Sequence, residues 1–264
     1  MIAQLPPVWL IQLFVVLLGL VVGSFTNVLI ARIPAGESIA WPGSRCPKCH
    51  HPVGWRDNVP VLSWLLLRGR CRWCRLPISV RYPVVELLSA LLYLAAYRKF
   101  GLSWLLFVRD LPFLTGLLAI TFIDLDHRII PNRLSLGLLV LGLGTAHWVP
   151  GLGLAEAATG AAAGFLGFYF LAVGYARATG KMGLGGGDVK LLAAIGAFLG
   201  AWGVLGTVLV SSVVGSLVGI GWGLLSGRRN VMGLAIPYGP FLVMGALCYF
   251  LLGGEQWLRS MIPM

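Results

Sequence analysis

The stretch VWLIQLFVVLLGLVVGSFTNVLIA, residues 8–31, decides the fold class of this chain. It is long and apolar enough to cross the hydrocarbon core of a bilayer, which takes about 20 helical residues. No basic residue precedes it and no clear small-residue cleavage site is present, so we expect a retained first helix and not a removed signal peptide. Of the 264 residues, 58% are hydrophobic and 11% are charged, and this composition argues against a soluble globule.

Seven further apolar windows follow, and the sequence predicts an all-α polytopic membrane protein with about eight transmembrane helices. The predicted spans are residues 8–31, 83–97, 104–123, 134–149, 155–176, 189–201, 203–225 and 237–253. We expect three parts along the chain. They are a first transmembrane helix (1–31), a small cysteine-knuckle cytoplasmic domain (32–82) and a seven-helix membrane domain (83–264) that carries the candidate catalytic residues.

Basic residues predict the orientation of these helices. If the N-terminus is outside, all but four of the 20 lysine and arginine residues fall in inner segments, the exceptions being Arg98, Lys99, Arg109 and Arg259. The positive-inside rule then predicts periplasmic N- and C-termini and a cytoplasmic hydrophilic loop. Basic residues beside anionic lipid account for the net charge of +11, so the expected partner is the lipid bilayer and not nucleic acid.

Four of the five cysteines lie in the one long hydrophilic loop. They form two CxxC pairs, Cys46 with Cys49 and Cys71 with Cys74, whose spacing is close to that of a four-thiolate zinc site. Such a zinc ion would be structural, because four protein ligands leave no open position for a substrate. The alternatives are disulfides, which a reducing cytoplasm disfavours, and unliganded thiols.

Three other residues are less favoured as metal ligands. His50 and His51 follow the first pair and could substitute as ligands, although solvated loop residues are the simpler interpretation. Cys248 stands alone in the last predicted helix, where we expect it to pack as a small apolar residue.

The connector IDLDHRIIPN, residues 123–132, joins the third and fourth predicted spans. Pro131 and Asn132 can end one helix and cap the next, so we expect Asp124 to lie at the inner end of the third span. Asp126 lies further along the connector and is expected to be more solvated. For either acid, a helix-end residue paired with a nearby arginine is the alternative interpretation.

The segment GKMGLGGGDVK, residues 180–190, predicts an inner loop that opens the sixth helix. Gly185, Gly186 and Gly187 allow a substrate peptide to approach the backbone, with Lys190 close by and Asp188 at the start of the helix. A phosphate-binding loop is disfavoured, because the Walker pattern ends in Gly-Lys-Ser/Thr and the dinucleotide pattern needs a preceding strand.

Asp124 and Asp188 are the best candidates for catalytic residues. Ionised carboxylates at a bilayer boundary are costly, and the chain has only nine Asp and Glu residues. Brought together, the two would share one proton and titrate as a coupled unit. One could activate a water molecule while the other polarises a carbonyl and assists amine departure, so the pair predicts acid/base proteolysis.

Several blocks, in order and over nearly the whole chain, resemble the bacterial type 4 prepilin peptidases. Besides the cysteine pairs, the matching blocks are GSFTNV (23–28), RIP (32–34), DNVP (57–60), SW (63–64), ISVRYP (78–83) with Glu86, the connector that holds Asp124, residues 185–190, and PYGPFL (237–242).

The resemblance implies a Gly-x-Gly-Asp aspartic protease of the bacterial inner membrane, in which Asp124 and Asp188 match the catalytic pair. Its substrates would be type IV prepilins and type II secretion pseudopilins, cut at the cytoplasmic face after a glycine and before a hydrophobic mature segment. Many members then methylate the new N-terminus with S-adenosylmethionine. Glu86 is a candidate contact for the substrate amine or the cofactor, with a pairing to Arg81 as the alternative.

Two other functions stay open at this point. One is a peptidase without methyltransferase activity, and the other is a cation-coupled transporter whose membrane aspartates bind the ion. Transport is disfavoured because no inverted repeat is apparent and both aspartates fall on one face. If the two aspartates, which have 63 residues between them, do not touch without substrate, we expect loop closure to complete the site.

Overall fold

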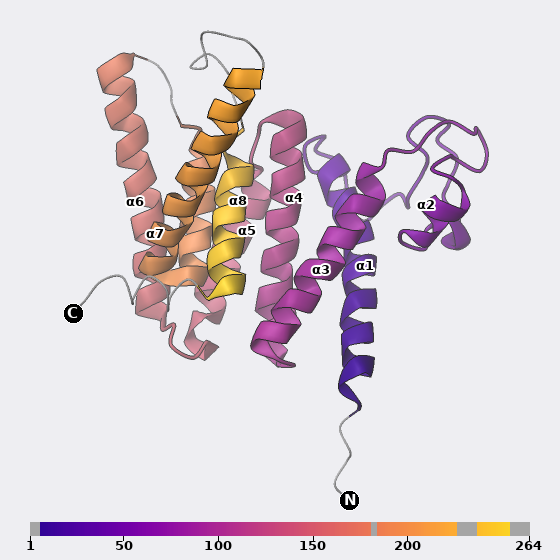
Figure 1. Cartoon of the computed structure of the whole chain (residues 1–264), viewed down its shortest axis with the longest axis horizontal. Coiled ribbons are helices and arrows are strands. Elements are labelled where there is room, and N and C mark those ends of the chain that lie inside the picture. Colours follow the sequence, from indigo (N-terminus) through magenta and orange to yellow (C-terminus); the bar gives the residue numbers. More distant parts are fainter. Residues whose placement is uncertain (1–5, 181–183, 226–236, 254–264) are drawn as a thin grey trace, which may run out of the picture. The chain divides into compact units, whose positions relative to one another are not determined.

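The computed structural model of the chain describes residues 6–180, 184–225 and 237–253 (Figure 1). Regular structure in these residues is helical, apart from three isolated β-bridges, which confirms the all-α prediction. Arg259 and the C-terminal residues used in the topology prediction lie outside the described residues. The chain divides into two compact units, Met1–Ala119 and Ile120–Met264. The predicted domain boundaries at residues 31 and 82 stay a prediction.

The described helices are these, in chain order: α1 (Val8–Arg32), η1 (Trp55–Asp57), α2 (Leu62–Leu66), α3 (Arg81–Phe100), the π-helical turn η2 (Leu106–Asp110), α4 (Leu111–His127), α5 (Asn132–Thr145), η3 (Ala146–Trp148), α6 (Leu154–Thr179), α7 (Gly186–Leu225) and α8 (Gly239–Leu252). By length and composition, four stretches could cross a membrane: Val8–Arg32, Leu106–His127, Leu154–Thr179 and Gly186–Leu224. The shorter α8 is also apolar. The chain is therefore a multi-pass membrane protein.

In the first unit, α1 and α3 pack side by side (Figure 1). Two glycines of α1 bring the backbones close together. A Cβ atom on Gly19 would lie 2.6 Å from the Cα of Ala90, and one on Gly23 would lie 2.6 Å from the Cα of Glu86. Small residues at such crossings are how membrane helices associate, because burial from lipid adds no hydrophobic driving force.

The loop between α1 and α3 contains the same cysteine turn twice. In the first turn, the Cys46 N–H donates to the His51 carbonyl and the His50 N–H donates back to the Cys46 carbonyl, each at 3.0 Å. The second turn repeats this pattern around Cys71, at 2.9 and 3.0 Å. The fifth residue of each turn has a positive φ, 56° at His50 and 59° at Arg75. The repeat in the sequence is thus also a repeat in the structure.

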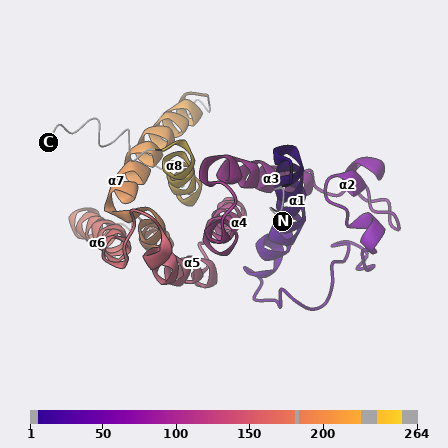
Figure 2. The ribbon, with the colours of Figure 1, turned by 90° about the horizontal axis from the view of Figure 1, so that it is seen from below.

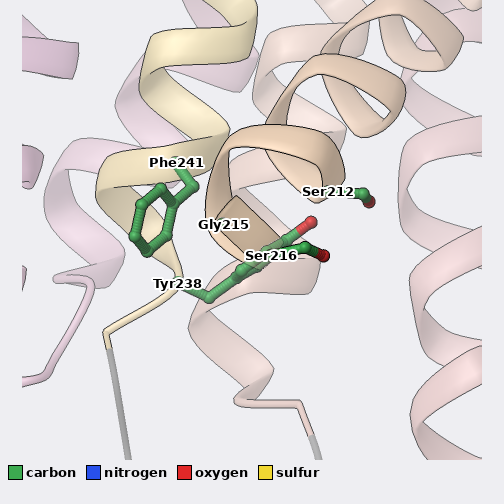
Figure 3. A pocket seen from close by; sticks show the side chains of 5 residues that line it. All are labelled: Ser212, Gly215, Ser216, Tyr238 and Phe241. Atoms are coloured by element: carbon green, nitrogen blue, oxygen red, sulfur yellow. The ribbon is translucent and has the colours of Figure 1, made fainter. Parts of the chain in front are cut away.

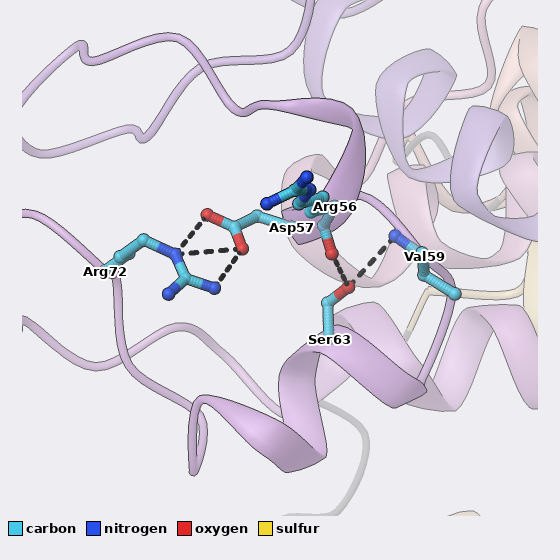
Figure 4. A network of polar contacts seen from close by, with 5 residues as sticks. All are labelled: Arg56, Asp57, Val59, Ser63 and Arg72. Carbon is cyan, nitrogen blue, oxygen red and sulfur yellow. Dashed lines mark hydrogen bonds and ion pairs between the residues drawn. The ribbon is translucent and has the colours of Figure 1, made fainter.

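A polar network ties η1 and α2 to the second cysteine turn (Figure 4). Asp57 accepts hydrogen bonds from the Nε and Nη2 atoms of Arg72, the latter at 2.6 Å, and these bonds lower the pKa of the Asp57 carboxyl. Ser63 Oγ accepts from the Val59 N–H and donates to the Arg56 carbonyl, both at 3.0 Å. Because this loop is too short to form a core of its own, polar contacts of this kind order it.

In the second unit, α7 packs against α5, α6 and α8, and Figure 2 shows it next to α6 and α8. The contact with α6 is the closest. A Cβ atom on Gly160 would lie 2.3 Å from the Gly196 carbonyl oxygen, and one on Gly164 would lie 2.5 Å from the Leu192 carbonyl oxygen. Glycine at these positions lets the two helices touch along their backbones.

Helix α7 is broken at Gly200, where φ is 69° and ψ is −177°. This conformation is accessible essentially only to glycine, and it divides α7 into residues 186–199 and 201–225. The sequence places the division between the sixth and seventh spans within two residues of this point. An unbroken helix of 40 residues would be about 60 Å long, twice the thickness of the hydrocarbon core.

The connector between α4 and α5 agrees with the prediction for Asp124 and differs from it at Asn132. Helix α4 continues to His127 and ends at Arg128, whose φ is 56°, so Asp124 lies inside the last turn of the helix. The expectation that Asn132 caps α5 is wrong. Pro131 is the N-cap residue, and no side-chain hydrogen bond caps the helix.

Replacement of Gly160 by alanine should destabilise the second unit, because the new Cβ atom would collide with the Gly196 carbonyl and force α6 and α7 apart. We expect a loss of about 1–3 kcal/mol, measured as a lower Tm of the purified protein in detergent. Gly167→Ala on the same helix is the matched control, since its Cβ atom would meet nothing within 4 Å. Equal Tm values for the two variants would contradict the close contact.

Candidate active site

Asp124, in the last turn of α4, is buried, with an exposed fraction of 5%. Its Oδ2 atom accepts a hydrogen bond of 3.0 Å from the N–H of Gly239, the first residue of α8. A Cβ atom at position 239 would lie 2.6 Å from this oxygen, so glycine is required for the contact. The start of α8 thus brings an unused backbone donor and the positive end of the helix dipole to a buried carboxylate.

Asp188 lies in the first turn of α7. Its Oδ2 atom accepts a hydrogen bond from the Gly185 N–H at 3.2 Å, while its own N–H donates to the Gly185 carbonyl at 3.1 Å. The predicted loop glycine therefore forms the turn that orients Asp188. Gly186 has open space where a side chain would be.

The start of α7 is held against the connector that follows Asp124. A Cβ atom on Gly187 would lie 2.9 Å from the Cβ of Ile130. Lys190 Nζ donates to Asn132 Oδ1 at 2.9 Å, which is the contact that Asn132 makes in place of a cap. These contacts join residues that are far apart in the sequence. They place Asp188 beside the end of α4.

The structure therefore brings the two candidate aspartates into one site. Ile130 lies against both helix starts: a Cβ atom on Gly187 would be 2.9 Å from its Cβ, and one on Gly239 would be 3.3 Å from its Cδ1, so the segments that hold the two carboxyl groups meet at this side chain. Within the described residues, no hydrogen bond joins the two carboxyl groups. Each has its Oδ2 atom bound to a glycine N–H and its Oδ1 atom without a hydrogen-bond partner in this part of the chain. Two oxygens are thus available for a water molecule and a substrate.

Two other residues of this region bear on the sequence interpretation. Asp126 is exposed, as expected for the more solvated acid of the connector. Gly239 lies in the PYGPFL block (237–242), but the block by itself does not indicate the contact with Asp124. A usable signal was present, because Pro240 marks the first turn of a helix and places the preceding N–H at an open helix end.

The four loop cysteines form a second candidate site, in the first unit. Their sulfur atoms all lie within 4.8 Å of one another. The Sγ atoms of Cys46 and Cys74 are 3.9 Å apart, and those of Cys49 and Cys71 are 4.0 Å apart. A tetrahedral zinc ion with Zn–S bonds of about 2.3 Å requires sulfur separations of about 3.8 Å. The thiols therefore fit a zinc ion.

The electrostatics of the cluster also favour a cation. Backbone N–H groups of Cys74 and Trp73 lower the pKa of the Cys71 thiol to about 7. At Cys74 the Leu76 N–H lowers the pKa of the thiol. Burial and the neighbouring thiols outweigh this effect and raise the pKa of Cys74 to about 11. Thiolates this close repel one another, and a bound cation removes that repulsion.

The remaining candidates for metal ligands lie outside this cluster. The ring of His51 packs against Trp73, with the ring centroids 4.0 Å apart, and neither His50 nor His51 is among the clustered ligand atoms. Cys248 is half-buried in α8. All five cysteines are free thiols.

Glu86 is a buried carboxylate in the first unit, with an exposed fraction of 7%. Its Oε2 atom accepts a hydrogen bond of 2.7 Å from the Val61 N–H. Val61 has a φ of 61°, which is strained for a β-branched residue. Glu86 thus fixes the start of α2 against α3. A role in cofactor binding stays a prediction.

Together these features define the class of protein, a multi-pass helical membrane protein with paired carboxylates at helix ends and a four-cysteine loop. Family comparisons agree with this class. Residues 17–100 match the family described as "Bacterial Peptidase A24 N-terminal domain", and residues 111–220 match the one described as "Type IV leader peptidase family". The chain belongs to the type IV leader peptidase family.

Several curated relatives carry the name prepilin leader peptidase/N-methyltransferase. The protein from Myxococcus xanthus is 44% identical over 221 residues, which is 84% of this chain and 66% of that protein. The Aeromonas hydrophila protein is 41% identical over 93% of this chain and 92% of its own. The Pseudomonas putida protein is 39% identical over 97% and 95%, respectively. No solved structure matches the chain significantly.

Purified protein should contain about one zinc ion per chain, because four thiols complete one tetrahedral site. Cys46→Ser or Cys71→Ser should lose the metal, as measured by elemental analysis of the detergent-solubilised protein. Cys248→Ser is the matched control, since it removes a thiol outside the cluster. Metal-free but fully active wild-type protein would leave only the unliganded-thiol interpretation.

Proposed function

We propose that Asp124 and Asp188 are the catalytic pair of an aspartic endopeptidase that removes the leader from prepilins. The activity is that of a prepilin leader peptidase/N-methyltransferase. The observation that carries the assignment of the pair is the shared site. Two carboxylates from the facing ends of α4 and α7 each have one oxygen held by a glycine N–H and the other available.

The proposed reaction is a direct hydrolysis. A water molecule between the two Oδ1 atoms loses a proton to the ionised carboxylate as it attacks the scissile carbonyl. The other carboxyl, which is protonated, hydrogen-bonds to the carbonyl oxygen and stabilises the tetrahedral intermediate. The leaving nitrogen then takes a proton from the pair, the C–N bond breaks, and one shared proton remains.

The surrounding residues position this pair. Gly239 and Gly185 orient the carboxylates by donating their N–H groups to the Oδ2 atoms. The Oδ1 atom of each carboxylate has no such contact among the described residues. Gly185, Gly186 and Gly187 have no side chains, and we propose that the substrate backbone passes beside them. The Lys190 bond to Asn132 keeps the start of α7 in register with the connector.

The proposed substrates are type IV prepilins and type II secretion pseudopilins, each with a basic leader and a hydrophobic mature segment. We propose eight membrane crossings, formed by α1, α3, α4, α5, α6, the two parts of α7, and α8. With periplasmic termini, both aspartates then lie at the cytoplasmic face of the bacterial inner membrane, where the leader meets the bilayer. An attacking water is accessible at that boundary.

S-adenosylmethionine is the methyl donor that we propose for the N-methyltransferase activity, and when bound it supplies an electrophilic methyl group. Glu86 stays the predicted contact for an amino group. Its geometry limits that role, because Oε2 accepts a hydrogen bond from the Val61 N–H and the carboxylate is also hydrogen-bonded to the Ser24 side chain. The zinc ion that we propose for the four cysteines has a structural role.

Asp124→Asn and Asp188→Asn should each reduce leader removal by about a hundredfold or more, because an amide of the same shape cannot exchange the proton. The measurement is the cleavage rate of a purified prepilin with a basic leader. Asp126→Asn is the matched control from the same connector and should cleave at nearly the wild-type rate. Leader removal that survives either of the first two changes would rule out the proposed pair.

Methylation can be tested separately on the product. With S-adenosylmethionine present, the mature N-terminus should gain the mass of one methyl group in mass spectrometry, and without it the mass should not change. Asp124→Asn should still methylate a synthetic mature segment, because no leader has to be removed. An unchanged mass in every reaction of the wild-type protein would favour a peptidase without methyltransferase activity.

A further inference from the structure

A groove of about 300 Å³ lies in the second unit, between the second part of α7 and the beginning of α8. Figure 3 shows the residues that line it, which are Ser212, Gly215, Ser216, Tyr238 and Phe241. The volume is at the small end of ligand sites. It suits one side chain with its adjoining backbone and not a whole helix.

The two walls of the groove differ in chemistry. Tyr238 and Phe241 form an aromatic wall, and their ring centroids are 6.4 Å apart. Ser212 and Ser216 lie one helical turn apart on the other wall, and both are exposed. Among the described residues, neither serine hydroxyl has a hydrogen-bond partner, although both lie in an apolar stretch that could cross a membrane. Such hydroxyls can receive a polar group of a ligand.

The groove is directly connected to the proposed catalytic pair. Tyr238 is the neighbour of Gly239, whose N–H binds Asp124. The Tyr238 hydroxyl is 2.9 Å from Ser211 Oγ, and Ser211 Oγ donates to the Val208 carbonyl at 3.0 Å. The bond to Ser211 holds Tyr238 in place, and Tyr238 in turn precedes the residue that binds Asp124. The Tyr238 ring of the aromatic wall and the N–H that binds Asp124 therefore come from consecutive residues.

The proposed substrate must unwind near the cut, and its backbone then needs hydrogen-bond partners that this groove can supply. A peptide bond within a helix is shielded, so the chain must unwind before the carboxylates can reach it. Unwinding leaves backbone N–H and C=O groups without partners, and lipid offers none. The hydroxyls of Ser212 and Ser216 supply partners at membrane depth, while the aromatic wall accepts an apolar side chain.

On the basis of the proposed function, we infer that this groove is the subsite for the first residues of the mature segment, on the membrane side of the scissile bond. The aromatic wall holds the side chain that follows the cut, and the two serines bind the unwound backbone. The floor of the subsite is Gly215, where a Cβ atom would lie 3.6 Å from Phe241 Cγ, an ordinary contact. A larger side chain at this position fills the groove.

The test uses the full-length enzyme and two synthetic prepilin peptides that differ only in the first mature residue, phenylalanine or alanine. Gly215→Leu should lower kcat/KM for the phenylalanine peptide about tenfold relative to the alanine peptide. Gly221→Leu is the control on the same helix, since a Cβ atom there would meet nothing within 4 Å, and it should keep the wild-type preference. If the leucine variant fails to accumulate, Gly215→Ala gives the same comparison with a smaller change.

An unchanged preference in Gly215→Leu, or an equal loss for both peptides, would overturn the subsite. The proposed function fails differently, through absence of cleavage by the wild type or through cleavage that persists in Asp124→Asn. The backbone contacts have their own measurement. Ser212→Ala with Ser216→Ala should raise KM about threefold to tenfold for both peptides alike, and an unchanged KM would exclude the hydroxyls from binding.

Discussion

The hydrogen bond from the Gly239 N–H to Asp124 is the interaction on which the site depends. A carboxylate buried at the end of an apolar helix needs a donor, because neither lipid nor hydrocarbon side chains can supply one. The open N-terminus of α8 provides that donor without a second buried charge. Asp188 is held in the same way by the Gly185 N–H. Helix termini therefore orient both acids, and each keeps one carboxyl oxygen without a hydrogen bond among the described residues.

Close helix packing is what makes this arrangement possible. Helix α7 contributes Asp188 at its start and one wall of the proposed subsite in its second part, so its position matters at both places. The approach of Gly160 to the Gly196 carbonyl fixes its first part against α6. The break at Gly200 then allows the second part to pack with α8. Glycine allows a close backbone approach at the first of these points and a positive φ at the second.

The first unit solves a different problem, which is to order a polar loop that has little apolar material to bury. Paired cysteine turns, the Arg72 bond to Asp57 and the Glu86 bond to the Val61 N–H hold it instead. The Arg72 and Glu86 bonds are polar contacts, and the four clustered thiols could hold a metal ion, consistent with the general need of small loops for such cross-links. The strain at Val61 persists because the buried carboxylate stabilises that conformation.

The sequence by itself determined the membrane class, the all-α fold, the break near residue 200, the four clustered cysteines and the two candidate acids, because composition, periodicity and local motifs are short-range properties. Only the tertiary structure decided that Gly239, 115 residues from Asp124, binds it, that Asn132 meets Lys190 and does not cap its helix, and that a groove opens beside the pair. These contacts depend on how close two helices approach, and that is set by packing between distant segments.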